Sequence, residues 1–417
     1  MKKVLLVFLL MSFVLSAFAL EKAPIERATA DEFYLMPMSG EPAASDKWRE
    51  EDYAWYCKDL YECGFNATGF IPIKYLKYAK ENNLKCNIGC FDLRNDKEKD
   101  INKRAEDWAK KINDAIPAEY RDTVLRIYTQ DEPFPKDLEA DSAYAKAMAK
   151  YGLVSYINFN PNYSDILLGQ PYDEYVDSFV KQCGLDYVIY DNYSWDVDEG
   201  FQEDRFYSNM EEIARIARNN NAKFFNIILA SAHFNYAKPT DYSLNVQVWS
   251  TLAYGGRGIG YYKYIDPERT NYVGSAYDKY GRKTETWYIT QGINYAIHNL
   301  NHVYKDLEWV NTFHWGNIPK GCQGPETAKL IKSFKPSCRG GENLVVGEFV
   351  GKKDGKYYAL LVNKDPKHSV HVNGLEFNKG TKNMLILDYS FEERREMTFE
   401  WERTWIQPGH ALLIRCD

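Results

Sequence analysis

The sequence predicts a (β/α)8 barrel followed by a small antiparallel β-sandwich. Three observations lead to this fold class. Between about residues 30 and 310, eight short β-rich runs alternate with helical stretches. Eight β-then-α units are the number that closes a parallel sheet into a barrel. After about residue 310 the helical patterns stop and strand patterns continue to the end of the chain, which is typical of a sandwich.

Each predicted barrel strand is followed by a helix-like segment. The strands are the runs at residues 33–37, 65–70, 86–92, 124–129, 154–159, 187–190, 224–229 and 258–262. The clearest helices are at residues 52–63, 74–81, 101–116 and 286–304. A doubly wound open sheet is the alternative. No GxGxxG turn follows the first strand, however, so the sequence has no nucleotide-binding signature, and we favour the barrel for residues 30–310.

Residues 311–417 have the pattern of the sandwich. Two apolar runs, 344–350 and 356–362, flank an Asp354-Gly355 pair, which is a strong signal for a hairpin turn. Further strands are expected near residues 369–372, 383–389 and 410–415. Because no catalytic pattern occurs among them, we expect the chemistry to lie in the barrel.

The first residues have the pattern of a secretory signal. Lys2 and Lys3 precede the apolar run Val4–Leu15, and the small residues Ala17 and Ala19 follow it. This run is shorter than the ~20 apolar residues that a membrane-spanning helix needs. We therefore predict a signal peptide at residues 1–19, cleaved after Ala19, and a secreted or periplasmic protein. No other stretch is long and apolar enough to span a bilayer.

Composition excludes some partners and favours another. The net charge of -7 offers no basic surface for nucleic acid. The absence of CxxC and HExxH patterns argues against a zinc site, and we predict neither a metal nor a cofactor. The 33 tyrosines and 10 tryptophans suit carbohydrate binding, because aromatic faces stack on sugars while hydroxyls form hydrogen bonds. The tyrosines could equally fill the rim of a core.

Acidic residues follow two of the predicted strands. Strand four ends in Asp131-Glu132-Pro133, and strand six is followed by Asp191, which lies among aromatic residues. In a (β/α)8 barrel the working residues come from the carboxyl ends of the strands. Glycoside hydrolysis requires two carboxyl groups, one on each side of the bond that is cleaved. The sequence therefore predicts a glycoside hydrolase with Glu132 and Asp191 as the catalytic pair.

A family resemblance agrees with this assignment. Asp131-Glu132-Pro133 resembles the Asn-Glu-Pro motif of the clan A glycoside hydrolases. The stretch from Gln247 to Tyr262 resembles the helix-seven to strand-eight passage of family 42-like β-galactosidase barrels. The resemblance covers about residues 30–310 and implies that Glu132 is the general acid/base. Gln247 itself lies on a predicted helix, where a structural role and a functional one are both open.

The sequence departs from that family at strand seven. The family's nucleophile is a Glu at the end of this strand, where the present chain reads Ala230-Ser231-Ala232-His233-Phe234 without a carboxylate. Asp131 also replaces the Asn that binds the sugar 2-hydroxyl in the family. We therefore expect Asp191 to supply the second carboxylate, either as nucleophile or as base for water. Asp131 and Asp92, which ends predicted strand three, are the other candidates.

Further polar and aromatic residues at the predicted strand ends are expected to bind the carbohydrate substrate. They are Asp131, Asn158, Asn160, Tyr193, Trp195, His233 and Tyr262. A non-catalytic carbohydrate-binding barrel is the alternative function, motivated by the missing strand-seven Glu. Against it, three acidic side chains in one barrel mouth are costly unless they are paired or used. An ester or amide hydrolase is disfavoured because no GxSxG motif is present.

Overall fold

The computed structural model describes residues 26–38, 49–164, 167, 169–268, 270–337, 342–380, 383–387, 397–398 and 404–417. The predicted signal peptide at residues 1–19 lies outside this set. Within it, no helix is long and apolar enough to cross a membrane.

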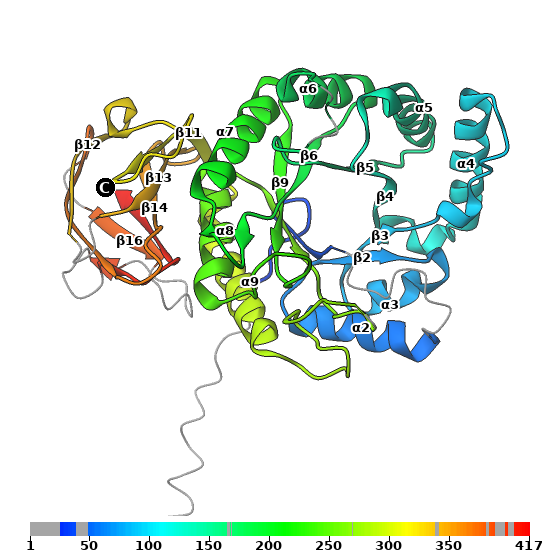
Figure 1. Cartoon of the computed structure of the whole chain (residues 1–417), viewed down its shortest axis with the longest axis horizontal. Helices are drawn as coiled ribbons and strands as arrows, with labels where there is room; N and C mark the ends of the chain where they lie inside the picture. Colours follow the sequence, from blue (N-terminus) through cyan, green and yellow to red (C-terminus); the bar gives the residue numbers. More distant parts are fainter. Residues whose placement is uncertain are drawn as a thin grey trace, which may run out of the picture.

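Eight parallel strands form the barrel, in the order β1-β10-β9-β6-β5-β4-β3-β2 (Figure 1). Their bounds are β1 (Tyr34–Pro37), β2 (Ala67–Ile71), β3 (Lys85–Ile88), β4 (Val124–Asp131), β5 (Ser155–Phe159), β6 (Tyr187–Asn192), β9 (Lys223–Leu229) and β10 (Gly258–Tyr262). Between β1 and β2, the Asn66 backbone N–H donates to the Leu35 carbonyl at 3.3 Å, and the Leu35 N–H donates to the Asn66 Oδ1 at 2.9 Å. The predicted fold class is confirmed.

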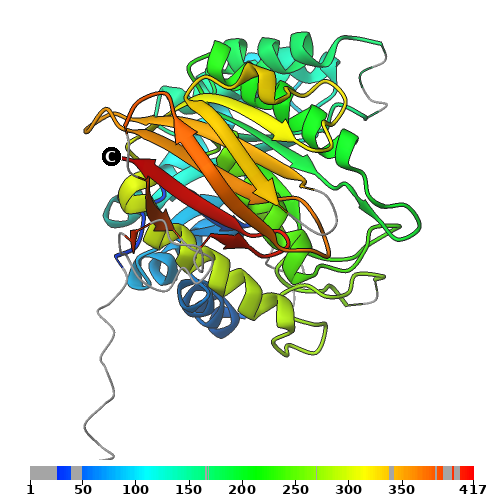
Figure 2. The ribbon, with the colours of Figure 1, turned by 90° about the vertical axis from the view of Figure 1, so that its left-hand side faces the viewer.

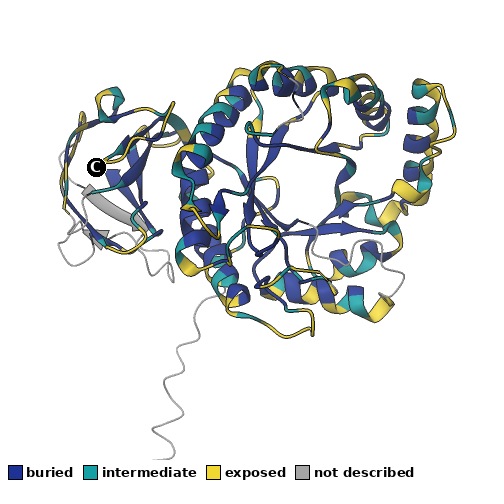
Figure 3. Ribbon diagram, viewed as in Figure 1, coloured by how far each residue is buried: buried dark blue, intermediate teal, exposed yellow. Residues whose placement is uncertain are grey.

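Helices surround the strands and turn their buried faces toward them, while their outer faces are exposed (Figure 3). The α-helices are α2 (Glu50–Glu62), α3 (Leu76–Glu81), α4 (Ile101–Ala115), α5 (Leu138–Ala149), α6 (Tyr172–Cys183), α7 (Glu203–Asn219), α8 (Asp241–Ala253) and α9 (Glu285–Tyr304). Short 3₁₀ segments are η1 (Ile73–Tyr75), η2 (Phe91–Leu93), η3 (Ala118–Thr123), η4 (Pro135–Asp137) and η6 (Pro325–Thr327). A short hairpin, β7 (Trp195–Asp196) and β8 (Gly200–Phe201), precedes α7.

Side chains fill the interior of the barrel. Phe225 of β9 occupies the space that two glycines of β10 leave: a Cβ at Gly258 would lie 2.1 Å from the Phe225 Cδ2, and one at Gly260 would lie 2.8 Å from its Cε1. The Tyr34 ring packs against Phe225 with 4.8 Å between centroids. Because large rings need small neighbours in a packed barrel, the glycines of β10 are explained by packing.

An ion pair between a buried arginine and a partly exposed aspartate lies near the amino end of the barrel. Arg126 of β4 donates two hydrogen bonds, of 2.7 and 2.8 Å, to the carboxylate of Asp186, which directly precedes β6. Only 6% of the Arg126 side chain is exposed, against 59% of the Asp186 side chain. The guanidinium also lies 4.9 Å from the centre of the Tyr187 ring. The bidentate pairing compensates for burying the cation.

Two antiparallel sheets form the C-terminal sandwich, in the strand orders β11-β13-β14-β19-β16-β17 and β12-β15-β18 (Figure 2). The bounds are β11 (Leu307–Trp315), β12 (Ile331–Ser337), β13 (Leu344–Gly351), β14 (Tyr357–Asn363), β15 (Val370–Phe377), β16 (Asn383–Leu387), β17 (Met397–Thr398), β18 (Trp405–Ile406) and β19 (Ala411–Cys416). The larger sheet packs against α8. Thr312 donates a 2.9 Å hydrogen bond to the Ala253 carbonyl, and a Cβ at Gly347 would lie 2.2 Å from the same oxygen.

Candidate active site

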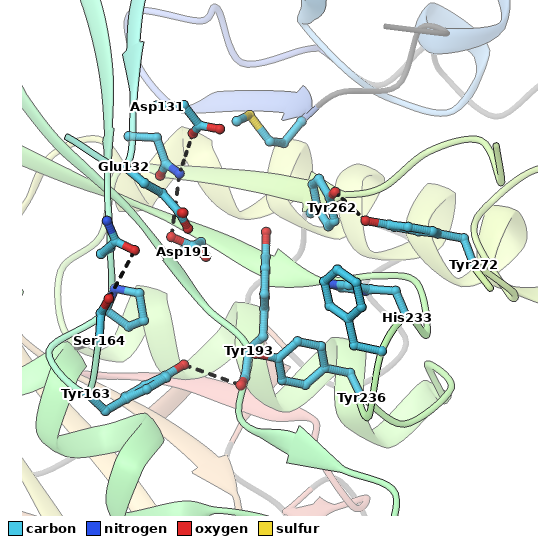
Figure 4. A pocket seen from close by; sticks show the side chains of 15 residues that line it. Asp131, Glu132, Tyr163, Ser164, Asp191, Tyr193, His233, Tyr236, Tyr262 and Tyr272 are labelled. Atoms are coloured by element: carbon cyan, nitrogen blue, oxygen red, sulfur yellow. Dashed lines mark hydrogen bonds between the residues drawn. The ribbon is translucent and has the colours of Figure 1, made fainter. Parts of the chain in front are cut away.

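A pocket of about 460 Å³ opens at the carboxyl end of the barrel strands (Figure 4). Among the residues that the structure describes, its lining consists of Met38, Asp131, Glu132, Asn158, Asn160, Pro161, Tyr163, Ser164, Asp191, Tyr193, His233, Phe234, Tyr236, Tyr262 and Tyr272. The segments at the ends of β4, β5, β6, β9 and β10 all contribute to it. This is the end at which barrels place their working residues.

Glu132 directly follows β4 and has an unusual backbone conformation. Its φ is +45°, in the left-handed region that residues other than glycine rarely adopt. Its N–H still donates a 2.8 Å hydrogen bond to the carbonyl of Asn158, and Tyr175 holds the next residue by donating to the Pro133 carbonyl at 2.6 Å. Such conformations persist where the surroundings fix them, and they cluster at functional sites.

The amide of Asn158 links two of the acidic side chains. Its Nδ2 lies 3.1 Å from the Asp131 Oδ1 and 3.5 Å from the Asp191 Oδ1. Asp191 is 6% exposed, whereas the side chain of Asp131 is open to the pocket. Figure 4 shows the carboxyl group of Glu132 beside that of Asp191. The ends of β4 and β6 thus bring three carboxyl groups into one cluster.

Each of the three carboxyl groups has a raised pKa. Burial raises the pKa of Asp191 well above its ordinary value, and the charges of Glu132 and Asp131 raise it further. Loss of solvation, together with the charge of Asp131, raises the pKa of Glu132. Loss of solvation also raises the pKa of Asp131, against the hydrogen bonds from Asn158 and Tyr128. Like charges at this separation do not all ionise readily, so the cluster is poised to hold a proton.

Aromatic rings form the facing wall of the pocket. The His233 and Tyr272 rings stack with 4.8 Å between centroids, and the Tyr193 and Tyr262 rings stack at 5.5 Å. The hydroxyls of Tyr262 and Tyr272 lie 2.8 Å apart. Tyr236 completes the wall, 4.9 Å from His233. We call Tyr193, His233, Tyr236, Tyr262 and Tyr272 the aromatic wall.

His233 follows the end of β9, in a segment without a carboxylate. Its Nδ1 lies 2.9 Å from the carbonyl of Ser231, an acceptor, so Nδ1 carries the proton and Nε2 is left as an acceptor. Burial lowers the pKa of His233, and the positive charge of Lys263 lowers it further. The ring is therefore a neutral hydrogen-bonding group at neutral pH, and not a general acid.

Gln247 has a structural role. It lies fully buried on α8, where its Oε1 accepts from the Leu229 N–H at 2.9 Å and its Nε2 donates to the Leu229 carbonyl at 3.2 Å. This amide pair holds the end of β9 in place, and Gln247 is not among the described residues that line the pocket. Of the two roles left open by the sequence, the structural one therefore holds.

The structure brings most of the predicted site residues to one pocket. Those that line it are Asp131, Glu132, Asn158, Asn160, Asp191, Tyr193, His233 and Tyr262. Trp195 is not among the described residues that line the pocket. Its ring stacks on Phe201 at 3.9 Å and packs against Phe206 of α7, because the β7–β8 hairpin turns it toward the helix layer. Asp92 is exposed in η2 and does not line the pocket.

Sequence reasoning missed several lining residues. Tyr236 and Tyr272 come from loops well beyond the ends of β9 and β10, and Phe234 and Ser164 were not singled out. The high tyrosine content was the available signal, but it does not tell which loops fold over the barrel mouth.

Neither a protein-family model nor a curated protein sequence matches this chain. Solved structures with a similar fold include a β-galactosidase from the psychrophilic Marinomonas ef1, with 8% identity and a TM-score of 0.49 over 64% of this chain and 60% of that one. They also include an endo-1,4-β-D-mannanase from Thermotoga petrophila RKU-1, with 10% identity and a TM-score of 0.45 over 63% of this chain and 99% of that one. A putative α-L-fucosidase from Bacteroides thetaiotaomicron has 13% identity and a TM-score of 0.43 over 68% of this chain and 98% of that one. At such low sequence identity, these similarities extend to the fold alone. This chain spans about three fifths of the length of the β-galactosidase.

Proposed function

We propose that this protein is a glycoside hydrolase that cleaves oligo- or polysaccharides with a carboxyl pair at the barrel mouth. The observation that carries the proposal is the cluster at the ends of β4 and β6, where the charge of Glu132 raises the pKa of Asp191 and the charge of Asp131 raises the pKa of both. Cleavage of a glycosidic bond needs one protonated and one ionised carboxyl group across the bond. The proposal assigns catalysis to residues 30–310 and export to residues 1–19.

The roles within the pair follow from accessibility. Glu132 is open to the pocket and has a raised pKa, so it is suited to donate a proton to the leaving oxygen. Asp191 lies deeper, and burial favours its protonated form, whereas the hydrogen bond from Asn158 favours its ionised form. The proposal requires the shared proton to lie on Glu132 when the substrate is bound. Asp191 then attacks the anomeric carbon or activates water. Asp131 and Asn158 orient the pair, and the aromatic wall receives the sugar rings.

The test is release of reducing ends from a panel of polysaccharides and aryl glycosides. Glu132→Gln is compared with the wild type and with Glu139→Gln, a matched change at an exposed carboxyl on α5. We expect Glu132→Gln to lose about 10²-fold or more of the activity, while Glu139→Gln retains it. Thermal unfolding and sugar binding serve as controls for the fold. Equal activity of Glu132→Gln and wild type would move catalysis away from β4.

The stereochemistry of the first-formed product separates the two roles of Asp191. Proton NMR during early hydrolysis reports the anomer. Net retention identifies Asp191 as the nucleophile, and net inversion identifies it as the base for water.

The second candidate function is a carbohydrate-binding barrel without catalysis. The observation that favours it is the end of β9, where His233 and no carboxylate faces the pocket. A wild type that binds sugars but releases no reducing ends from any member of the panel would support this function over hydrolysis.

A further inference from the structure

Phe234, in the loop between β9 and α8, combines an exposed ring with a place in the pocket. It is 79% exposed, the highest value among the large apolar residues that the structure describes, and it lines the pocket. Its ring therefore lies where the pocket opens to solvent. A single exposed apolar side chain is ordinary on a protein surface, and its backbone is what sets this one apart.

The backbone at Phe234 is strained. Its φ is +49°, in the left-handed region that bulky residues rarely adopt. Phe234 is the second residue of a turn that is closed by a 2.8 Å hydrogen bond from the Tyr236 N–H to the His233 carbonyl. Turns with positive φ at this position are usually formed by Gly, Asn or Asp. A phenylalanine there costs stability, and its exposed ring gains little from burial in return, so the fold does not explain the residue.

Neighbouring loops hold this turn from both sides. The N–H of Val197, at the tip of the β7–β8 hairpin, donates a 2.9 Å hydrogen bond to the Asn235 carbonyl. In the loop after β10, Val273 exchanges two backbone hydrogen bonds of 3.0 Å with Ala232. Val197 and Val273 are themselves 64% and 53% exposed. Exposed apolar residues thus lie on three joined loops beside the pocket, and the position of Phe234 is fixed by all three.

Phe234 continues the aromatic wall toward solvent. Its ring centroid lies 5.2 Å from that of His233, with an angle of 62° between the planes. All the described lining residues that come from the end of β10 and from the loops after β9 and β10 are aromatic, and none is Asp, Glu, Lys or Arg. An uncharged ring at the mouth suits the apolar C–H face of a sugar, whose hydroxyls then stay in water.

We propose that Phe234 forms a second sugar-binding site outside the pocket and that the substrate is a glycan chain that occupies both sites, an inference that rests on the proposed function. One sugar unit packs on the aromatic wall beside the carboxyl cluster, and the next unit of the chain stacks on Phe234. Because the phenyl ring forms no hydrogen bonds, the second site recognises the flat face of a sugar and not the configuration of one hydroxyl. Affinity then depends on chain length.

Binding of sugars of increasing length tests this inference. The probes are gluco-, galacto- and manno-configured mono-, di- and trisaccharides in α and β linkage, measured by calorimetry. The wild type is used with probes that it does not cleave, and Glu132→Gln with those that it does. We expect the second unit to raise affinity about tenfold. Phe234→Asn should remove this gain and leave monosaccharide affinity unchanged, whereas Phe234→Trp should keep the gain because it restores a stacking face.

Stability and a matched variant exclude a merely structural role. Because Asn adopts positive φ more readily than Phe, Phe234→Asn should be at least as stable as its parent in thermal unfolding. Tyr280→Asn is the control: it removes a ring that is 70% exposed, in a loop turn, from a residue that is not among the described lining residues. This change should leave the chain-length gain intact.

The outcomes separate the second site from the proposed function. Affinity that is independent of chain length, an equal loss for mono- and disaccharides in Phe234→Asn, or a large loss of stability would overturn the second site. If aryl glycosides gain affinity through Phe234 and disaccharides do not, the occupant is an apolar aglycone and the sugar assignment is overturned. A gain through Phe234 without cleavage of any glycan would reject the hydrolase and keep the second site, and cleavage without the gain would do the reverse. If no sugar binds and no glycan is cleaved, both proposals fail.

Discussion

Strands β4 and β6 carry charged side chains near both of their ends, and the two ends differ in how the charge is compensated. Near the amino end, Arg126 and Asp186 form a bidentate ion pair. At the carboxyl end, Asp131 and Glu132 lie beside Asp191, and all three side chains are acidic. The same two strands thus hold an attractive pair and a repulsive cluster, separated only by the length of the barrel strands.

The pKa directions show what each arrangement does. Burial acts to raise the pKa of Asp186, but the hydrogen bonds and charge of Arg126 outweigh it, and the pKa is lowered. At the carboxyl end, burial and neighbouring charges together raise the pKa of Asp191. The first arrangement supports folding, whereas the second opposes it. A cluster that costs stability and yet is held firmly by Asn158 and Tyr175 is the pattern expected of a working site.

The largest expected effect is on catalysis at the carboxyl end. We expect Asp191→Asn to lower kcat about 10³-fold, because the amide neither attacks carbon nor takes a proton. The same change should raise the free energy of unfolding at neutral pH, because it removes a buried like charge. Kinetics on the best substrate of the panel and denaturant unfolding measure the two quantities. The control is Asp92→Asn, and a fully active Asp191→Asn enzyme would contradict the assignment.

The amino end should show the opposite behaviour. Asp186→Asn leaves the buried guanidinium of Arg126 without its counter-charge. We expect the free energy of unfolding to fall by about 2–3 kcal/mol, since a buried charge has lost charged hydrogen bonds. Activity per folded molecule should stay near that of the wild type, because the pair lies at the far end of the strands. Urea unfolding measures the stability of Asp186→Asn, and kinetics on the same samples measure its kcat. A large loss of kcat with unchanged stability would contradict a purely structural role for the ion pair at the amino end.

Two aromatic residues from the same loop offer a third comparison. Trp195 packs on Phe201 and Phe206, while Tyr193 lines the pocket. Trp195→Leu should lower the free energy of unfolding by about 2 kcal/mol and leave sugar affinity unchanged, because the loss is of buried ring contacts. Tyr193→Leu should weaken sugar binding about tenfold, because a stacking face is removed. Calorimetry measures the sugar affinity of both variants, and thermal unfolding measures their stability. If Trp195→Leu weakened sugar binding as much as Tyr193→Leu does, Trp195 would be shown to contact the substrate.

The barrel and the acidic cluster were both predictable from the sequence, and for one reason. Buried parallel strands appear as short apolar runs, so the ends of β4 and β6 could be located closely enough to select Glu132 and Asp191. The geometry of the fold then brings the carboxyl ends of strands together without further information. Strand three was the weakest case: its predicted run extends to residue 92, but β3 ends at Ile88 and a 3₁₀ turn follows.

The loop residues were not predictable in the same way. The direction of Trp195 depends on its pairing with Phe201 within the β7–β8 hairpin. It also depends on the hydrogen bond that Ala237, in the loop after β9, donates to the Trp195 carbonyl. Tyr272 reaches the pocket ten residues beyond Tyr262 at the end of β10. Local patterns do not contain such long-range contacts, which is why the aromatic wall was only partly predicted.

The smallest expected effect is the pH dependence of stability at Asp131. Its folded pKa lies above the unfolded value of 3.8, so the folded state binds more protons than the unfolded state between these values, and stability falls as pH rises through that window. Asp186 behaves oppositely, because its lowered pKa gives stability that is present above 3.8 and lost only as pH falls through the folded value.

Asp131→Asn should therefore be about as stable as the wild type near pH 3, and more stable by about 0.5 kcal/mol at pH 7. The gain is small because Asp131 is open to the pocket and water screens its charge. Denaturant unfolding at a series of pH values measures it, and a variant that is less stable than the wild type at pH 7 would show that Asp131 is stabilised by a partner and not strained by its neighbours.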